Sequence, residues 1–155
     1  IMRYAASLAG LDSDNLYTQG KINEIIDVID GWRTSFSPTF YIDDLDEKIA
    51  ARKALFEPGA KIDAGLKDLE TLFENSQTGW IAGTEDMTLA DVKAFLNTFM
   101  MFSGQFDGIE ETMIQPYPLL LQYHQKMANH PGIKSYYDRE DEWRWVYKPE
   151  AFSND

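Results

Sequence analysis

The sequence contains no cysteine among its 155 residues. This absence excludes a disulfide framework, a thiolate nucleophile and a cysteine-ligated metal within the chain. Histidine is almost as scarce, because His124 and His130 are the only two, and neither has the spacing typical of a zinc site or of a catalytic triad. We expect His124 to be a partly exposed residue of a helix. The sequence predicts no metal centre and no catalytic residue.

Basic residues are in deficit, with 14 Lys and Arg against 26 Asp and Glu, and the net charge is −12. This excess of negative charge disfavours binding to nucleic acid or to anionic membrane surfaces. No apolar run approaches the ~20 residues that a membrane-spanning helix needs, and the N-terminus lacks a signal-peptide pattern. An isoleucine at position 1 indicates a start inside a longer protein. We therefore expect a cytoplasmic protein, or one of an organelle whose targeting segment lies upstream of residue 1.

Hydrophobic residues, by contrast, make up 44% of the sequence and aromatic residues 14%, which predicts a packed domain. Apolar residues recur at three- and four-residue spacing, as in amphipathic helices, and no segment is convincing as a strand. The expected fold is all-α. Its helices are expected at about 15–36, 43–56, 62–79, 88–102, 116–129 and 133–139.

The segment 87–102 is the most apolar of the expected helices. Thr88 can cap its start, and Asp91, three residues on, can accept a bond from the backbone N–H of Thr88 in a capping box. Beyond the cap the segment is apolar on nearly every side, and such a helix lies inside a protein with other helices around it. We therefore assign Thr88 and Asp91 a structural role at the start of a buried central helix.

The motif that leads into this helix has a family resemblance. Gly79-Trp80-Ile81-Ala82-Gly83, followed by Met87-Thr88-Leu89-Ala90-Asp91, resembles the signature that opens the central helix of glutathione transferase C-terminal domains. The segment 21–33 looks closest to the sigma-like classes of that family.

Two further segments share the resemblance, and together they imply the domain organisation. Residues 1–9 resemble the last helix of the family's thioredoxin-like domain, and 123–137 resemble the end of its helical domain. The resemblance implies three parts. These are the end of a thioredoxin-like domain (1–10), a helical C-terminal domain of five to seven helices around the buried central helix (11–140), and an aromatic tail (141–155).

The resemblance implies a function as well. A parent protein of this family would conjugate glutathione, its co-substrate, to hydrophobic electrophiles, and would form a homodimer. The residues that activate glutathione belong to the family's thioredoxin-like domain and would precede Ile1, so this chain alone is expected to be inactive. The alternative is a non-catalytic, transferase-like interaction module that docks a partner protein within a larger assembly. A third reading is a small-ligand carrier that uses the same cleft.

The resemblance places the candidate site residues on the first long helix and in the tail. Asp30 is the candidate for a cross-subunit contact with glutathione, although the next position, often acidic in sigma-like members, is Gly31. Arg33, Phe36 and Phe40 follow at one-turn spacing, toward the family's hydrophobic substrate pocket. Trp143 or Trp145 would close that pocket. The alternative roles are a solvent-facing carboxylate for Asp30 and core packing for the aromatic residues.

Overall fold

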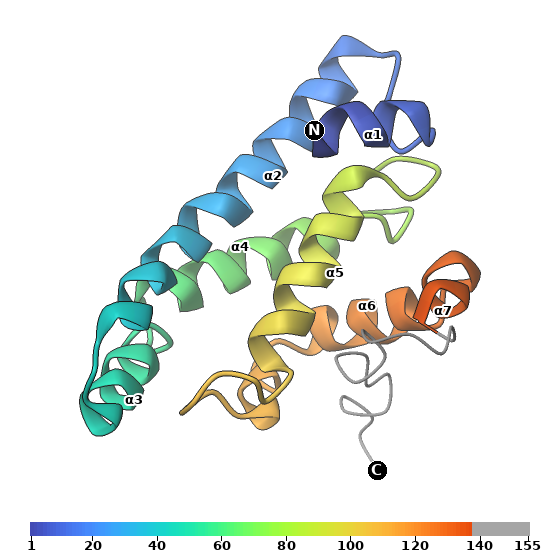
Figure 1. Ribbon diagram of the computed structural model, residues 1–155. Helices are drawn as coiled ribbons and strands as arrows, with labels where there is room; N and C mark the ends of the chain where they lie inside the picture. Colours follow the sequence, from blue (N-terminus) through green and yellow to red (C-terminus); the bar gives the residue numbers. More distant parts are fainter. Residues whose placement is uncertain (138–155) are drawn as a thin grey trace.

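The structure is a computed structural model that describes residues 1–137 (Figure 1). Within that range the chain forms seven α-helices and two short 3-10 helices, with no strand. The all-α prediction of five to seven helices is confirmed. In chain order the elements are α1 (Met2–Leu8), α2 (Leu16–Phe36), η1 (Ser37–Tyr41), α3 (Leu45–Ala54), α4 (Lys61–Glu74), α5 (Leu89–Phe102), η2 (Glu111–Ile114), α6 (Pro118–Ala128) and α7 (Pro131–Tyr137).

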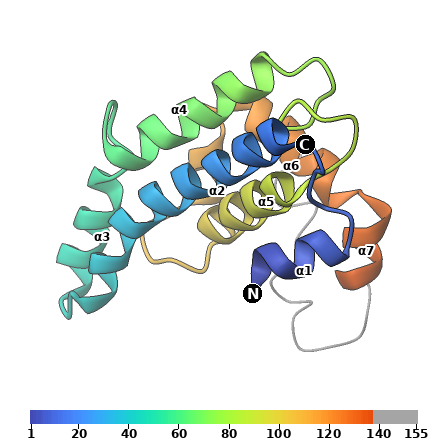
Figure 2. The ribbon, with the colours of Figure 1, turned by 90° about the horizontal axis from the view of Figure 1, so that it is seen from above.

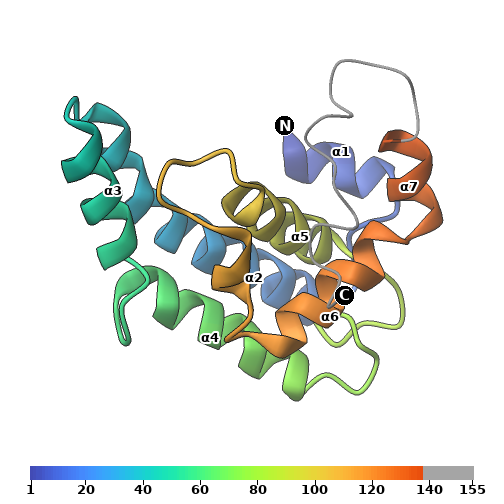
Figure 3. The same cartoon turned by 90° about the horizontal axis from the view of Figure 1, so that it is seen from below.

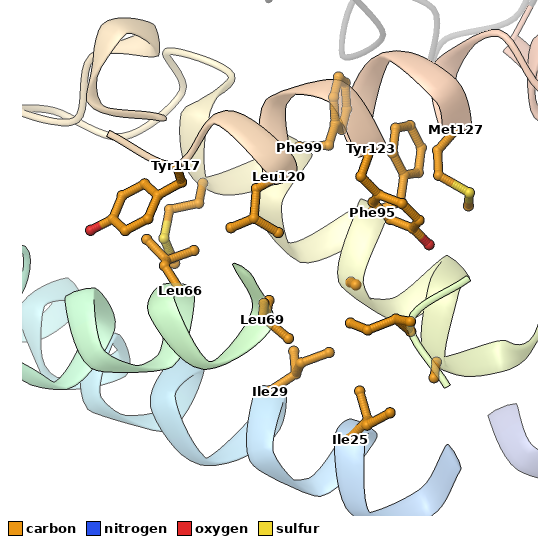
Figure 4. Close-up of a cluster of buried hydrophobic side chains, with 14 of the residues drawn as sticks. Ile25, Ile29, Leu66, Leu69, Phe95, Phe99, Tyr117, Leu120, Tyr123 and Met127 are labelled. Carbon is orange, nitrogen blue, oxygen red and sulfur yellow. The ribbon is translucent and has the colours of Figure 1, made fainter. Parts of the chain in front are cut away.

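Helix α5 is the centre of the described domain. It packs against α2 on one side and against α6 on the other, and α4 packs against both α2 and α6 (Figures 2 and 3). Ten of its 14 residues are buried. Side chains from all four helices meet in one core, drawn in Figure 4, which includes Ile25, Ile29, Leu66, Leu69, Phe95, Phe99, Leu120, Tyr123 and Met127.

One face of α5 departs from the expectation of burial all round. Leu96 and Met100, four residues apart, are 36% and 47% exposed. They lie on the same side of the helix because i and i+4 positions share a face. Helix α5 is therefore central but not fully enclosed, and its open side lies beside the pocket described below.

The start of α5 has the predicted capping box between Thr88 and Asp91. The Asp91 carboxylate is fully buried and accepts four hydrogen bonds. Its Oδ2 accepts from the backbone N–H (2.7 Å) and the hydroxyl (2.8 Å) of Thr88. Its Oδ1 accepts from the backbone N–H of Ile81 (2.8 Å) and the hydroxyl of Tyr123 (2.8 Å). The carboxylate thus joins the 79–83 motif, α5 and α6.

Helix α2 is capped by Asn15 rather than by Asp12 or Ser13, two earlier residues of types that also favour caps. The Oδ1 of Asn15 accepts from the backbone N–H groups of Tyr17 (3.0 Å) and Thr18 (3.1 Å). The Asp12 carboxylate is engaged elsewhere, since it accepts from the backbone N–H of Ser13. The helix therefore starts three residues after Asp12, at the Asn15 cap.

His124 is buried, and the expectation of partial exposure is wrong. Its side chain is 1% exposed. The imidazole lies against two rings of α5, with its centroid 4.9 Å from that of Phe95 and 5.8 Å from that of Phe99. Burial lowers the pKa of His124 from 6.5 to about 3, because desolvation disfavours the charged imidazolium. His124 is therefore a neutral core residue at neutral pH.

Among the helices of residues 1–137, none combines the length and apolar character that crossing a membrane requires. The tail 141–155, with Trp143 and Trp145, lies outside the described residues. Residues 1–10 form α1 and a turn at Gly10, whose φ is 71°. Their assignment to a thioredoxin-like domain stays a prediction.

The crossing of α2 and α4 leads to a stability prediction. A Cβ added to Gly65 of α4 would lie 2.5 Å from Cδ1 of Trp32, which is 2% exposed. We expect Gly65→Ala to lower the free energy of unfolding by about 1–3 kcal/mol through overpacking, although alanine favours a helix by about 1 kcal/mol. The matched control is Gly31→Ala in α2, whose Cβ would meet nothing within 4 Å. Urea titration should find that control neutral or stabilised, and a stabilised Gly65→Ala would contradict the tight crossing.

Candidate functional site

A small pocket lies where the end of α2, η1 and the second half of α5 meet. Its volume is about 110 Å³. It brings together three of the residues that the sequence singled out, Arg33, Phe36 and Phe40. The full lining consists of Arg33, Phe36, Ser37, Phe40, Asn97, Met100, Met101 and Phe106. Trp143, the fourth pocket residue expected from the sequence, lies outside the described residues.

Three phenylalanine rings form the apolar wall of the pocket. Phe36 ends α2, and Phe40 follows in η1, because Pro38 at the start of η1 redirects the chain out of the long helix. Phe106 comes from the loop after α5. The ring centroids lie 5.5 Å apart for Phe36 and Phe40, 5.0 Å for Phe36 and Phe106, and 5.8 Å for Phe40 and Phe106, all edge to face. We call these residues the three-ring cluster.

A buried arginine touches all three rings. The guanidinium carbon of Arg52 on α3 lies 5.3, 5.5 and 5.7 Å from the ring centroids of Phe36, Phe40 and Phe106. Arg52 is 3% exposed. A buried guanidinium is costly unless it is paired, and this one donates to Asp107, at 3.1 Å to the carbonyl and 3.3 Å to the carboxylate. Arg52 therefore ties the loop that carries Phe106 to the rest of the pocket wall.

Next to Arg33, and outside the lining of the pocket, lies a carboxylate that contacts two cations. Asp30 is half exposed, and its Oδ1 lies 2.7 Å from Nζ of Lys93 and 3.9 Å from the guanidinium of Arg33. The Lys93 side chain is only 10% exposed, so Asp30 is the counter-charge of a buried cation. The carboxylate proposed for a cross-subunit contact with glutathione is thus already engaged within its own subunit. That contact stays a prediction.

Sequence reasoning missed Arg52, Phe106 and Lys93. No local signal marks Arg52, because α3 is largely polar and an arginine on such a helix is usually solvated. Phe106 falls between two expected helices, 88–102 and 116–129, where no helical spacing marks a pocket residue. A lysine in the otherwise apolar segment 87–102 was a visible anomaly, since a buried ammonium needs a partner. That signal could have led from Lys93 to Asp30.

The lining supports binding rather than bond-making chemistry. Of its eight residues, five are apolar, Ser37 and Asn97 are neutral and polar, and Arg33 carries the one charge. Within residues 1–137 no three carboxylate or imidazole side chains gather closely enough to hold a metal ion. None of the eight lining side chains is a carboxylate, an imidazole or a thiol.

A comparison with protein-family models matches residues 30–140 to the C-terminal domain of glutathione S-transferases. The chain belongs to this family. The family resemblance of the 79–91 motif is thereby confirmed. Every lining residue of the pocket lies within the matched residues 30–140. Among curated proteins, none matches the chain.

Two solved structures share the glutathione S-transferase helical fold. The structure of prostaglandin synthase D of Nilaparvata lugens superposes with a TM-score of 0.76 and 20% identity, over 91% of this chain and 66% of that one. Rat hPGDS complexed with a quinoline superposes with a TM-score of 0.66 and 19% identity, over 81% of this chain and 58% of that one. The chain thus spans less than two thirds of the length of either structure.

Proposed function

We propose that this chain is the helical half of a glutathione transferase-like protein that conjugates glutathione to hydrophobic electrophiles. In this proposal the helical half holds the electrophile, and residues outside this chain bind and activate glutathione. The observation that carries the proposal is the pocket of the three-ring cluster, which lies inside the matched family domain and is lined mainly by apolar side chains. The neighbour with a bound quinoline, an aromatic molecule, is consistent with it.

The size and lining of the pocket suit a flat aromatic or aliphatic group. Phe36, Phe40 and Phe106 offer ring faces and edges, and Met100 and Met101 offer flexible thioethers that adapt to different shapes. A ligand that buries an area similar to one aromatic side chain gains about 4–6 kcal/mol. Association costs of comparable size reduce this gain, so the helical half alone should bind such ligands weakly.

Homodimerisation is part of the proposal. The outer side of α2 and α4 forms an open groove of about 320 Å³, whose apolar residues include Ile25, Val28 and Leu72. Val28 is 41% exposed, and an apolar side chain exposed among charged neighbours suits a subunit contact. The cytoplasmic location stays a prediction.

The pocket can be tested with phenylnaphthylamine, a neutral fluorophore that brightens in apolar sites. Phe40 is 52% exposed, so Phe40→Ala should leave the domain folded while removing part of the pocket wall. We expect this variant to weaken phenylnaphthylamine binding about tenfold. Tyr41→Ala is the matched control, because Tyr41 is adjacent, 86% exposed and outside the lining. Equal binding by wild type and Phe40→Ala would contradict the pocket.

Titration with glutathione distinguishes the transferase proposal from the alternative that this chain contains a complete glutathione site. The ligand carries two carboxylates, whereas the chain has a net charge of −12 and the pocket has one lining cation, Arg33. We expect isothermal titration to find no glutathione binding tighter than millimolar and no conjugating activity. A micromolar constant would mean that these residues form a whole site. If the protein also fails to conjugate glutathione when a thioredoxin-like half is present, the alternative of a non-catalytic interaction module is favoured.

A further inference from the structure

One wall of the pocket is held differently from the others. Phe106 lies on the short loop from Gly104 to Gly108, which connects α5 to η2 (Figure 3). We propose that this loop is a movable wall, which swings outward to admit molecules larger than one ring, and that the ion pair between Arg52 and Asp107 is its latch. This proposal rests on the proposed function, because it concerns how the same pocket admits its ligand.

The first observation is the size of the pocket. Its volume is about 110 Å³. A cavity of ~150 Å³ holds one benzene ring, whereas sites for larger ligands have ~300–1,000 Å³. A molecule of several rings therefore fits only if a wall moves. The walls from α2 and α5 are fixed, because Phe36 and Met101 are 4% and 5% exposed and belong to the core.

The second observation is that the loop is attached at few points. Gly104 and Gly108 lie at its two ends with φ of 76° and 79°, a backbone region that other residues rarely adopt. Positions that absorb large changes of φ and ψ are the hinges of moving loops. Within residues 1–137, the hydrogen bonds that join this loop to α2, η1 or α3 are the two that Arg52 donates to Asp107. Release of one ion pair therefore frees the loop between its hinges.

The third observation is that the ion pair can open without a large penalty. The Arg52 side chain is 4% exposed, whereas that of Asp107 is 58% exposed, so water competes for the carboxylate. When Asp107 leaves, Arg52 keeps the bond from its Nε to the hydroxyl of Thr39 (3.2 Å). It also keeps its place against the rings of Phe36 and Phe40. The guanidinium is thus not left without partners in the open state.

A ligand replaces the ring contacts that opening removes. In the closed state the ring centroid of Phe106 lies 5.0 Å from that of Phe36 and 5.8 Å from that of Phe40. A ligand ring that enters takes the place of Phe106 against these two rings. Such a ligand binds the open state better than the closed one, and this difference is what shifts an equilibrium between two states.

The test measures the association rate constant of phenylnaphthylamine, whose three rings exceed the closed pocket, by stopped-flow fluorescence. We expect Asp107→Ala to raise this constant about fivefold, because the open state becomes more populated. Phe106→Ala should raise it as well, and the double variant should equal Phe106→Ala, since the latch acts by positioning that ring. The matched control is Glu110→Ala. It removes a neighbouring carboxylate that lies 3.9 Å from Nζ of Lys53, also on α3, and should change the constant less than twofold.

Hydrogen exchange tests the loop without any ligand. We expect the amides of residues 104–110 to exchange about fivefold faster in Asp107→Ala than in the wild type, and those of α2 to exchange at the wild-type rate. Because the Asp107 side chain is exposed, a thermal melt should find the variant folded.

The outcomes separate the movable wall from the proposed function. If phenylnaphthylamine binds but Asp107→Ala leaves either its association or the exchange of 104–110 unchanged, the movable wall is overturned while the pocket stands. Additive effects of Asp107→Ala and Phe106→Ala would overturn it too. If phenylnaphthylamine binds neither the wild type nor the variants, the proposed pocket is contradicted. Faster exchange of 104–110 would then still support the movable loop, and unchanged exchange would overturn both.

Discussion

Replacing Asp91 with alanine should lower the free energy of unfolding by about 3–5 kcal/mol, the largest effect that we expect for a substitution in this chain. The carboxylate has no exposed surface and accepts four hydrogen bonds. Its removal leaves the N–H of Ile81, the N–H of Thr88 and the hydroxyl of Tyr123 without their acceptor. Each buried donor that loses its partner costs about 1–3 kcal/mol. Urea titration at neutral pH measures the loss.

Two further variants serve as a control and as a test of the capping box. Asp68→Ala is the matched control, because Asp68 is an exposed acid on α4, and it should change stability by less than about 0.5 kcal/mol. Thr88→Ala should cost about 0.5–2 kcal/mol, as for other caps. Since the Thr88 hydroxyl donates to Asp91, the double variant should cost less than the sum of the two. Full additivity would count against the capping box. A loss below about 1 kcal/mol for Asp91→Ala would contradict the role of its carboxylate in joining the 79–83 motif, α5 and α6.

Lowering the pH should destabilise the domain through His124. The pKa of this histidine is about 3 when folded and about 6.5 when unfolded. The unfolded chain therefore takes up the proton first, so stability is full above about pH 6.5 and falls as the pH drops toward 3. The slope is about 1.4 kcal/mol per pH unit, so His124 alone should cost the domain about 2 kcal/mol at about pH 5.

A comparison of two variants isolates this histidine. His124→Phe places a neutral ring beside Phe95 and Phe99, and its unfolding free energy should vary less between about pH 7.5 and about pH 5. His130→Gln should keep the wild-type slope. Glu70 has a pKa raised by burial, which acts in the opposite direction because the folded state then binds its proton more tightly. Glu70 is present in every variant, so its contribution cancels when the variants are compared. A wild-type slope in His124→Phe would be the contradicting result.

Much of the fold could be predicted from local patterns. The Thr88 and Asp91 box and the end of the first long helix at residue 36 depend on a few neighbouring residues, and each lies close to its expected place. The grouping of Arg33, Phe36 and Phe40 in one pocket follows from the same stripe. These features depend on spacing along one chain segment, which a sequence displays directly.

The rest depended on contacts between distant segments. Arg52 reaches the pocket from α3, and its loop partner Asp107 is 55 residues further along, a pairing that no local pattern contains. The burial of His124 was not predicted for a different reason. It lies four residues after Leu120 and three before Met127, both buried, so helical spacing placed it on the inner face. The general preference of histidine for partial exposure was given more weight than that spacing.

Helix α5 can begin in one register only. Sliding the sequence by one residue along the position of α5 would turn every side chain by about 100° around the helix axis, and would carry Phe95 and Phe99 away from the core. The shifted helix would also lose its ties to Ile81 and Tyr123, because the oxygen atoms of Asp91 that close the first turn belong to the carboxylate that binds both of them. Winding of the central helix and docking of its neighbours therefore succeed or fail together.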